Sequence, residues 1–262
     1  MKLTCCIITR NCEEWIGLSL KSAMQTFDEI VIVDDNSTDN TKLVIDKLKD
    51  DRVKFYQQDF NYHFGKQRQY ALSKATGEWV FWLDSDECLN DGTREYIEEI
   101  ISLAKNNDSD YVDVQYVHFM NNFSNIDNNE IIHAGIARLH KNIPEITFTR
   151  KTHAVPDGCF EKKRILSSMK LCIYHFGYAR DQIDNYLRYK RNVLRSTMHS
   201  PMQVCAWRDW HYSGQYPTRK FNIDDLPKTA KDYFEIDKYD DETIKNTDNW
   251  AFWTKRIGGD LN

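Results

Sequence analysis

Two acidic side chains separated by one residue, Asp84 and Asp86, directly follow the apolar run Trp79–Trp82. A buried strand that ends in such a pair places both carboxylates at its carboxyl end, where open α/β sheets bind ligands. Oxygen ligands at this spacing suit a hard divalent cation, Mg²⁺ or Mn²⁺, held together with water and substrate phosphates. The alternative is a solvated turn, because Asp and the intervening Ser85 are ordinary loop residues.

Polar residues also follow two other apolar runs. Thr9, Arg10 and Asn11 end the first run, and Asp34 and Asp35 end the second. In a parallel sheet these strand ends share an edge with the acidic pair, so an acid there can accept hydrogen bonds from a nucleobase or a ribose hydroxyl. The alternative use of the second cluster is to cap the helix that follows it.

Phosphate groups at this edge would have to be neutralised by a metal and by basic side chains. The sequence contains neither GxGxxG nor GxxxxGK[ST], so it supports neither a dinucleotide fold nor a P-loop. Lys66 and Arg68 are the candidates, because they come just after Gly65 and open the helix that precedes the acidic strand. Their alternative role is a solvated helix face, since most Lys and Arg side chains are simply exposed.

The composition, 41% hydrophobic and 29% charged over 262 residues, is that of an ordinary soluble globular protein. A formal net charge of -5 argues against a nucleic-acid binder that relies on a basic face. No membrane span is expected, and the N-terminal apolar run is too short for a signal peptide. The cysteines are odd in number and form no CxxC pair, which argues against a disulfide framework or a zinc knuckle and favours a cytoplasmic location.

Apolar runs alternate with helical patterns up to about residue 107. Strands are expected over residues 3–9, 29–33, 53–57 and 78–83, and helical patterns cover 16–24, 41–48, 65–75 and 97–104. Repeated βα units predict a parallel sheet covered on both faces, and the uninterrupted apolar strands agree with that arrangement.

The pattern changes in the second half of the chain. Further strands are expected over residues 110–120, 136–140 and 171–176, the first with a wetter face that carries Asp113 and Gln115. Residues 121–129 are predicted to form a mobile polar loop. A helix is expected over 181–198, followed by a charged, aromatic-rich tail that packs within the protein, joins copies into a homo-oligomer or stacks against sugars.

Four runs, in matching order and spacing over about residues 1–105, resemble family 2 glycosyltransferases: Ile7-Ile8-Thr9-Arg10-Asn11, Ile32-Val33-Asp34-Asp35-Asn36-Ser37-Thr38-Asp39, Gly65-Lys66-Gln67-Arg68 and Ala75-Thr76-Gly77-Glu78-Trp79-Val80-Phe81-Trp82-Leu83-Asp84-Ser85-Asp86. The resemblance implies a GT-A fold, which is an α/β, Rossmann-like fold whose mostly parallel central sheet is flanked by helices. It also implies a nucleoside-diphosphate-sugar donor, expected to be a UDP-sugar, a divalent Mn²⁺ or Mg²⁺ ion, and inversion at the anomeric carbon.

The resemblance also implies roles by position. Asp84, Ser85 and Asp86 match the DxD of the family, with Asp86 as the metal ligand and Asp84 nearer the ribose and the sugar. Lys66 and Arg68 would lie near the base or the phosphates. The residues that would surround the nucleoside are Thr9, Arg10, Asn11, Asp34 and Asp35.

The second half resembles a subgroup that adds sugars to bacterial surface glycans, including lipopolysaccharide core, through Arg138-Leu139-His140-Lys141, Thr152-His153-Ala154 and His175-Phe176-Gly177-Tyr178. That subgroup often has an acid after the histidine that matches His153, and this chain has Ala154. An inverting transfer needs a base for the acceptor hydroxyl. The nearest substitutes are His153, Asp157 and Glu161, of which Asp157 is favoured. By position, His175 would be a late metal ligand; its alternative is a hydrogen-bonded structural histidine.

The sequence therefore predicts a metal-dependent, inverting glycosyltransferase with a glycan, lipid-linked or protein-linked hydroxyl acceptor. Its parts are a nucleotide-sugar-binding half over 1–107, an acceptor-side half over 108–178 and a helical extension over 179–262. One alternative is a sugar-nucleotide nucleotidyltransferase, which the lack of glycine after the first strand disfavours. Another is a phosphatase with Asp84 as nucleophile, although such a residue would more naturally follow the first strand. A third is a nucleotide-sugar-binding protein without turnover, which Ala154 favours.

Overall fold

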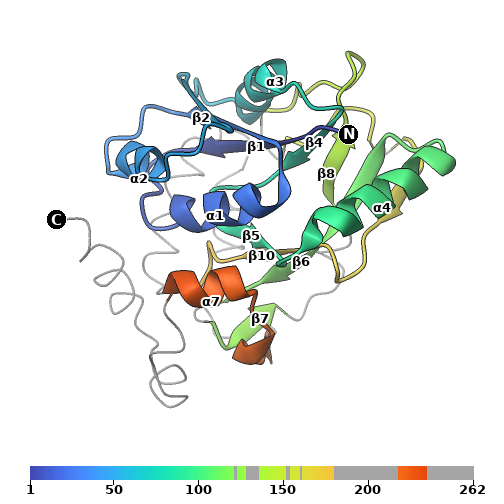
Figure 1. Ribbon diagram of the computed structural model, residues 1–262. Helices are drawn as coiled ribbons and strands as arrows, with labels where there is room; N and C mark the ends of the chain where they lie inside the picture. Colours follow the sequence, from blue (N-terminus) through green and yellow to red (C-terminus); the bar gives the residue numbers. More distant parts are fainter. Residues whose placement is uncertain (121–122, 128–135, 152–153, 160, 180–217, 235–262) are drawn as a thin grey trace, which may run out of the picture.

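A computed structural model describes residues 1–120, 123–127, 136–151, 154–159, 161–179 and 218–234 (Figure 1). One large sheet runs through it in the strand order β3-β2-β1-β4-β8-β6-β10-β5, and β9 pairs with β6 beside that path. Its strands are β1 (Leu3–Thr9), β2 (Glu29–Asp34), β3 (Val53–Gln57), β4 (Trp79–Trp82), β5 (Glu87–Leu89), β6 (Tyr111–His118), β8 (Ile136–Lys141), β9 (Arg164–Leu166) and β10 (Cys172–His175).

Helices cover this sheet, and a short two-stranded sheet lies beside it (Figure 1). The helices are α1 (Ile16–Thr26), α2 (Thr41–Lys47), α3 (Phe64–Lys74), α4 (Thr93–Asn106) and α7 (Lys228–Phe234), with a 3₁₀ turn η1 (Ile223–Asp225). The small sheet pairs β7 (Asn125–Asp127) with β11 (Thr218–Lys220). In the described part of the chain, no helix is long and apolar enough to cross a membrane.

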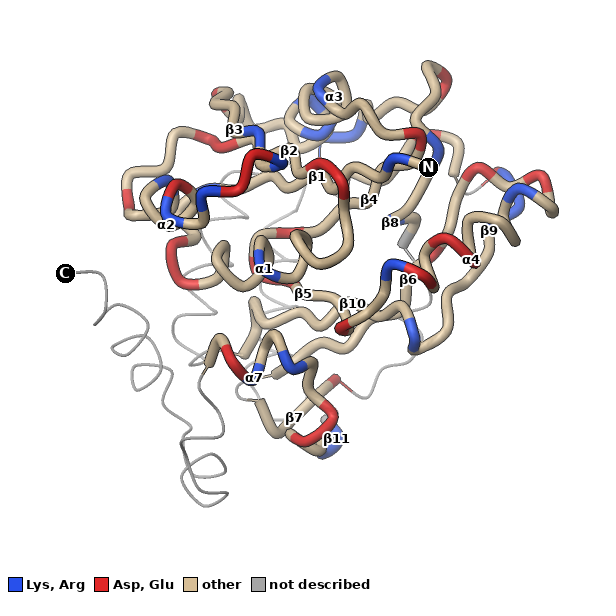
Figure 2. The backbone as a smooth tube through the Cα atoms, in the orientation of Figure 1, with Lys and Arg blue, Asp and Glu red and all other residues tan. Residues whose placement is uncertain are grey.

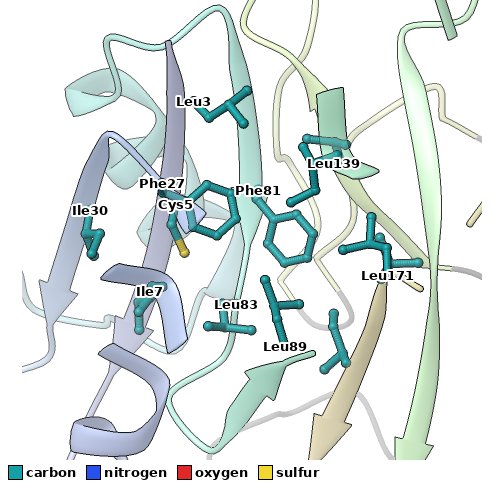
Figure 3. Packing of buried hydrophobic residues seen from close by; sticks show 14 of the residues in the cluster. Leu3, Cys5, Ile7, Phe27, Ile30, Phe81, Leu83, Leu89, Leu139 and Leu171 are labelled. Carbon is teal, nitrogen blue, oxygen red and sulfur yellow. The ribbon is translucent and has the colours of Figure 1, made fainter. Parts of the chain in front are cut away.

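The first four strands are parallel, as the sequence predicts, and β1, β2 and β4 are buried on both faces, whereas β3 at the edge of the sheet is only partly buried. Alternate residues of β1 explain why the strand shows no polar alternation: Leu3, Cys5 and Ile7 pack into the cluster with α1 and α4, while Cys6 packs with α3. Figure 3 shows Leu3, Cys5, Ile7 and Phe81 converging with Leu139 and Leu171 from the second half. The core is therefore shared by both halves of the chain.

The second half of the sheet brings late residues back to the carboxyl end of β4. β8 runs antiparallel to β4, with Phe81 opposite Leu139, so Arg138 lies beside the end of β4. β6 and β10 are parallel, with His118 opposite His175 at their shared carboxyl end. The topology thus collects strand ends from both halves at one edge.

Glu29 joins the elements at the opposite edge of the sheet. It is buried at the start of β2, and its carboxylate accepts hydrogen bonds from Thr4 Oγ1 at 2.6 Å and from the Thr76 backbone N–H at 2.7 Å. Lys54 Nζ of β3 lies 3.1 Å from the same carboxylate. One side chain therefore fixes the starts of three strands and the turn before β4.

Two sequence expectations are wrong in the second half. Asp113 does not lie on a wet face: it is 6% exposed, because β8 and β9 flank it, and it pairs with Arg164 at 3.2 Å. The predicted polar loop over 121–129 contains β7, which pairs with β11. The helix expected over 181–198 and most of the aromatic tail lie outside the described residues.

Candidate active site

Asp84, at the end of β4, is held between two arginines. Its Oδ1 lies 2.9 Å from Arg68 Nη2 of α3, and its Oδ2 lies 2.9 Å from Arg138 Nη2 of β8. The Arg68 guanidinium also lies over the Trp82 ring, 4.8 Å from its centroid. Burial alone would raise the pKa of Asp84, but Arg138 and Arg68 outweigh it and hold that pKa well below its usual range.

Glu87 completes a buried cluster behind this loop. Its Oε1 accepts from Arg138 Nη2 at 2.9 Å, and its Oε2 accepts from the Asp84 backbone N–H at 2.7 Å. Burial raises the pKa of Glu87, and the carboxylates of Asp84 and Asp86 add to this against the attraction of Arg138. Among the described residues, Arg138 Nε and Nη1 find no hydrogen-bond partner. Arg138 and Glu87 thus fix the shape of the acidic loop.

Asp86 faces His175 across the same edge of the sheet. Asp86 Oδ1 lies 3.7 Å from His175 Nε2, and each side chain is 13% exposed. The backbone N–H of Phe176 donates to the Asp86 carbonyl at 3.0 Å, which ties the segment after β10 to the acidic loop. The structure thus brings together Asp86 and His175, two of the residues predicted to hold a metal.

Gly177 leaves the space in which these two side chains meet. A Cβ atom at Gly177 would lie 2.5 Å from Asp86 Oδ2 and 2.7 Å from His175 Nε2. The carboxylate of Asp86 is the kind of ligand that Mn²⁺ and Mg²⁺ prefer, and the imidazole nitrogen of His175 faces the same cradle as a further ligand that a transition-metal ion such as Mn²⁺ can take. Asp84 fits less well, because both of its oxygens already contact arginines. In the described residues, no three His, Cys, Asp or Glu side chains gather as a complete ligand set.

The ends of β1 and β2 are joined by hydrogen bonds beside this site. The Asp35 backbone N–H donates to the Thr9 carbonyl at 2.9 Å, and Arg10 forms an ion pair with Asp35. Asp34 accepts from the Ser37 backbone N–H at 2.8 Å. Thr9 Oγ1 is buried without a hydrogen-bond partner in the described structure. The predicted nucleoside residues therefore share one loop region.

Asn11, after β1, also contacts the loop after β2, because its Oδ1 accepts from the Thr38 backbone N–H at 2.8 Å. Asp34 and Asp35 do not cap α2. The N-cap residue Asn40 makes no side-chain capping bond, and Asp39 Oδ1 accepts from the Thr41 N–H at 3.0 Å. The contact of Asp34 and Asp35 with a nucleoside stays a prediction.

The start of α3 gives its two basic residues different surroundings. Arg68 is nearly buried against Asp84, whereas Lys66 is exposed. The backbone N–H groups of Phe64 and Gly65 donate to the carbonyls of Lys151 at 2.9 Å and Arg150 at 3.0 Å. The carbonyls of Arg150 and Lys151 therefore take up these backbone N–H groups at the start of α3. Any phosphate contact at this end of the helix must then be made by side chains.

The predicted base region is only partly described. His153 lies outside the described residues. Ala154 packs with the apolar cluster that contains Trp82 and Phe148, at the position where the resembling subgroup has an acid. Asp157 is held by its own loop: its oxygens accept hydrogen bonds from Thr147 Oγ1 at 3.0 Å and from the Thr149 N–H at 2.8 Å and Oγ1 at 3.0 Å.

The mixed sheet with charged loops at its carboxyl edge has the architecture of α/β proteins that bind ligands at that edge. Figure 2 shows Lys and Arg interspersed with Asp and Glu along the described chain. The sequence model of one family, Glycosyl transferase family 2, matches residues 4–167, and the chain belongs to that family.

Curated relatives agree with this assignment. The chain is 32% identical over 106 residues to the lipopolysaccharide core biosynthesis glycosyltransferase LpsC of Rhizobium meliloti, covering 40% of this chain and 38% of that protein. It is 24% identical over 194 residues to the glycosyltransferase SunS of Bacillus subtilis, covering 73% of this chain and 43% of SunS. The chain spans less than half the length of the first curated relatives it matches.

Solved structures show the same fold. Residues 1–349 of S. aureus TarS in complex with UDP-GlcNAc superpose with a TM-score of 0.52 at 18% identity, over 99% of this chain and 83% of that chain. The predicted GT-A-type α/β fold is confirmed. A further relative is the poly(ribitol-phosphate) beta-N-acetylglucosaminyltransferase TarS of Staphylococcus aureus, 38% identical over 100 residues, 36% of this chain and 18% of that protein.

Proposed function

We propose that this chain transfers a sugar from a nucleoside diphosphate to a hydroxyl of a glycan or lipid-linked glycan acceptor, with inversion at the anomeric carbon. One observation carries the proposal: Asp86 and His175 face each other at 3.7 Å around the Gly177 cradle, at the edge where β1 and β2 also end. Membership of glycosyl transferase family 2 supports the reaction class.

The donor site is proposed at the carboxyl ends of β1, β2 and β4. Thr9, Arg10, Asn11, Asp34 and Asp35 would contact the nucleoside, and the unpartnered Thr9 hydroxyl is a donor that a ligand can satisfy. A UDP-sugar is the expected donor. The fold is shared with a neighbour whose solved complex holds UDP-GlcNAc, which supports this choice.

Charge at the donor diphosphate would be balanced by side chains and a divalent cation. Asp86 and His175 would hold Mn²⁺ or Mg²⁺, which when bound stabilises the negative charge of the leaving diphosphate. Arg68 is positioned by Asp84 and Trp82, and Lys66 is exposed nearby on α3. Asp84 and Ser85 would then contact ribose and sugar.

The base is proposed to come from the segment between β8 and β9. A carboxylate with three hydrogen bonds, as in Asp157, has fewer lone pairs left to take a proton. We therefore assign proton removal to His153 and loop anchoring to Asp157. A base of this kind contributes about 10²–10⁴-fold to the rate.

A second candidate function is nucleotide-sugar binding without turnover. Ala154 favours it, because this side chain packs in an apolar cluster where the resembling subgroup has an acid. The two functions share a donor site. They differ in whether the sugar is cleaved from the nucleoside diphosphate and transferred.

The first test is a thermal-shift panel of UDP, GDP, CDP and dTDP, each with and without Mn²⁺. A ligand at about a hundred times its Kd adds about 2.7 kcal/mol of stability. We expect a Mn²⁺-dependent shift with UDP that Asp86→Ala abolishes. Slow release of UDP from UDP-sugars would then support turnover, and binding without release would favour the second candidate. No shift with any nucleotide would overturn both.

A further inference from the structure

His118, at the end of β6, contacts the proposed ligand His175 from the side that faces away from Asp86. The two histidines are opposite each other in the parallel pairing of β6 and β10, and their Nδ1 atoms lie 2.8 Å apart. His175 Nε2 is the nitrogen that faces Asp86. The imidazole of His175 is thus contacted through one ring nitrogen and directed at Asp86 through the other.

Aromatic rings hold this pair in place. The His118 ring stacks on Tyr116, with centroids 5.1 Å apart and planes 8° apart. Tyr178 packs edge-on against His175 at 4.9 Å. Since stacked and edge-on aromatic contacts restrict ring rotation, both imidazoles are fixed in the orientation that lets their Nδ1 atoms meet.

A 2.8 Å contact between two Nδ1 atoms needs one donor and one acceptor. If neutral His118 donates, neutral His175 carries its own proton on Nε2 and has no lone pair there for a cation. If His175 donates, its Nε2 is bare and can bind a cation. Histidines that ligate metals generally donate their other N–H to an acceptor that fixes this tautomer.

We propose that His118 is a positioning residue that accepts the Nδ1 proton of His175 and so presents a bare His175 Nε2, beside Asp86, to a divalent cation. The inference rests on the proposed function, because it needs the cation site at Asp86 and His175. His118 itself does not touch the cation or the donor.

Two substitutions at His118 separate the hydrogen bond from packing. In His118→Asn the amide oxygen can take the place of Nδ1 as an acceptor, whereas His118→Leu has no acceptor at similar size. The affinity of the UDP complex for Mn²⁺ is measured from the free Mn²⁺ signal by electron paramagnetic resonance. We expect His118→Leu to lose about 10- to 100-fold and His118→Asn to stay within about threefold of the natural protein. Affinity for UDP without metal should be equal in all three.

A second measurement needs neither metal nor turnover. Long-range ¹H–¹⁵N spectra of the metal-free protein should show His175 protonated at Nδ1 and bare at Nε2, and His118→Leu should shift this tautomer. Equal Mn²⁺ affinity in His118→Leu and the natural protein, or equal losses in both variants, would overturn the role of His118. A natural protein that binds UDP but no Mn²⁺ would overturn the cation site and this inference while leaving the donor site. Absence of UDP binding would instead mark failure of the proposed function.

Discussion

Arg138 Nη2 lies 2.9 Å from Asp84 Oδ2 and also 2.9 Å from Glu87 Oε1. One buried nitrogen from β8 therefore compensates two carboxylates of the acidic loop. Its other two nitrogen positions lack a hydrogen-bond partner in the described structure, so the whole interaction of Arg138 with the loop depends on this atom. The acidic loop is thus held by a residue that lies 54 positions further along the chain.

Replacing Arg138 by Met should therefore destabilise the fold strongly. Removing one partner of a buried charge cluster leaves uncompensated charge and costs about 3–5 kcal/mol. Urea unfolding measures this loss. The control is Lys42→Met, which removes an exposed ion pair with Asp46 and should cost at most about 0.5 kcal/mol. Equal, small losses in both variants would show that Arg138 does not hold the loop.

Stability should fall in acid because of Glu29. Burial alone would raise its pKa, but hydrogen bonds from Thr4, Thr76 and Lys54 lower the pKa to about 2, from a usual value of 4.5. A carboxyl whose folded pKa is lowered stabilises the fold above its unfolded pKa and loses that contribution as the pH falls toward the folded value. Glu29 should thus contribute roughly 3 kcal/mol at neutral pH, lost between about pH 4.5 and pH 2. Urea unfolding across that window should show a smaller decline in Glu29→Gln, and an unchanged decline would contradict this assignment.

Gly177→Ala should weaken the proposed cation site with little effect on the rest of the fold. The added Cβ would lie within 2.7 Å of both Asp86 and His175, so these side chains must separate. We expect at least about a tenfold loss of Mn²⁺ affinity in the UDP complex, in line with losses seen when ligand orientation is disturbed. The measurement is Mn²⁺ titration by electron paramagnetic resonance.

Gly158→Ala is the matched control for that variant. Gly158 has φ +72° and no atom within 4 Å of an added Cβ, so alanine there strains only the backbone, by about 1–2 kcal/mol. Its Mn²⁺ affinity should be unchanged. A Gly177→Ala protein that binds Mn²⁺ as tightly as the control would show that the cation does not use this cradle.

Asp157→Asn and His153→Gln should affect different properties. Asp157→Asn disturbs hydrogen bonds to Thr147 and Thr149 and should cost about 1–3 kcal/mol of stability, with kcat reduced less than about tenfold. His153→Gln should lower kcat by about 10²–10⁴. Release of UDP in the presence of acceptor gives kcat, and urea unfolding gives stability. A hundredfold lower kcat in a fully stable Asp157→Asn protein would instead make Asp157 the base.

The parallel half of the fold is predictable because its physical causes are local. The strands at β1, β2 and β4 are continuous apolar runs, and the 3.6-residue spacing of α1 and α4 is clear in the sequence. β5, β9 and β11 have three residues each, which is too short for a periodic pattern. In the sequence Asp113 resembles a solvent-facing residue, but β8 and β9 pair on either side of it, and β9 lies more than fifty residues later in the chain.

The same distinction holds for the site. Asp84, Asp86 and His175 are recognisable because each follows an apolar strand. Arg138, Glu87 and His118 gain their roles only from long-range pairing, although an arginine between the apolar residues Ala137 and Leu139 of β8 is a usable sign in retrospect. Buried charge needs a partner, and an isolated one in a strand predicts that an acid lies across the sheet.

The position of Arg138 in the chain has a consequence for biosynthesis. Asp84 leaves the ribosome 54 residues before the arginine that compensates it. Until β8 has been translated and has paired with β4, the acidic loop lacks the Arg138 guanidinium that balances its charge in the folded protein. A nascent chain that ends near residue 107 therefore contains every residue predicted to contact the nucleoside. Its acidic loop still lacks Arg138, which holds that loop in the folded protein. Binding competence should arise late in translation, in one step, when the returning strand closes the sheet.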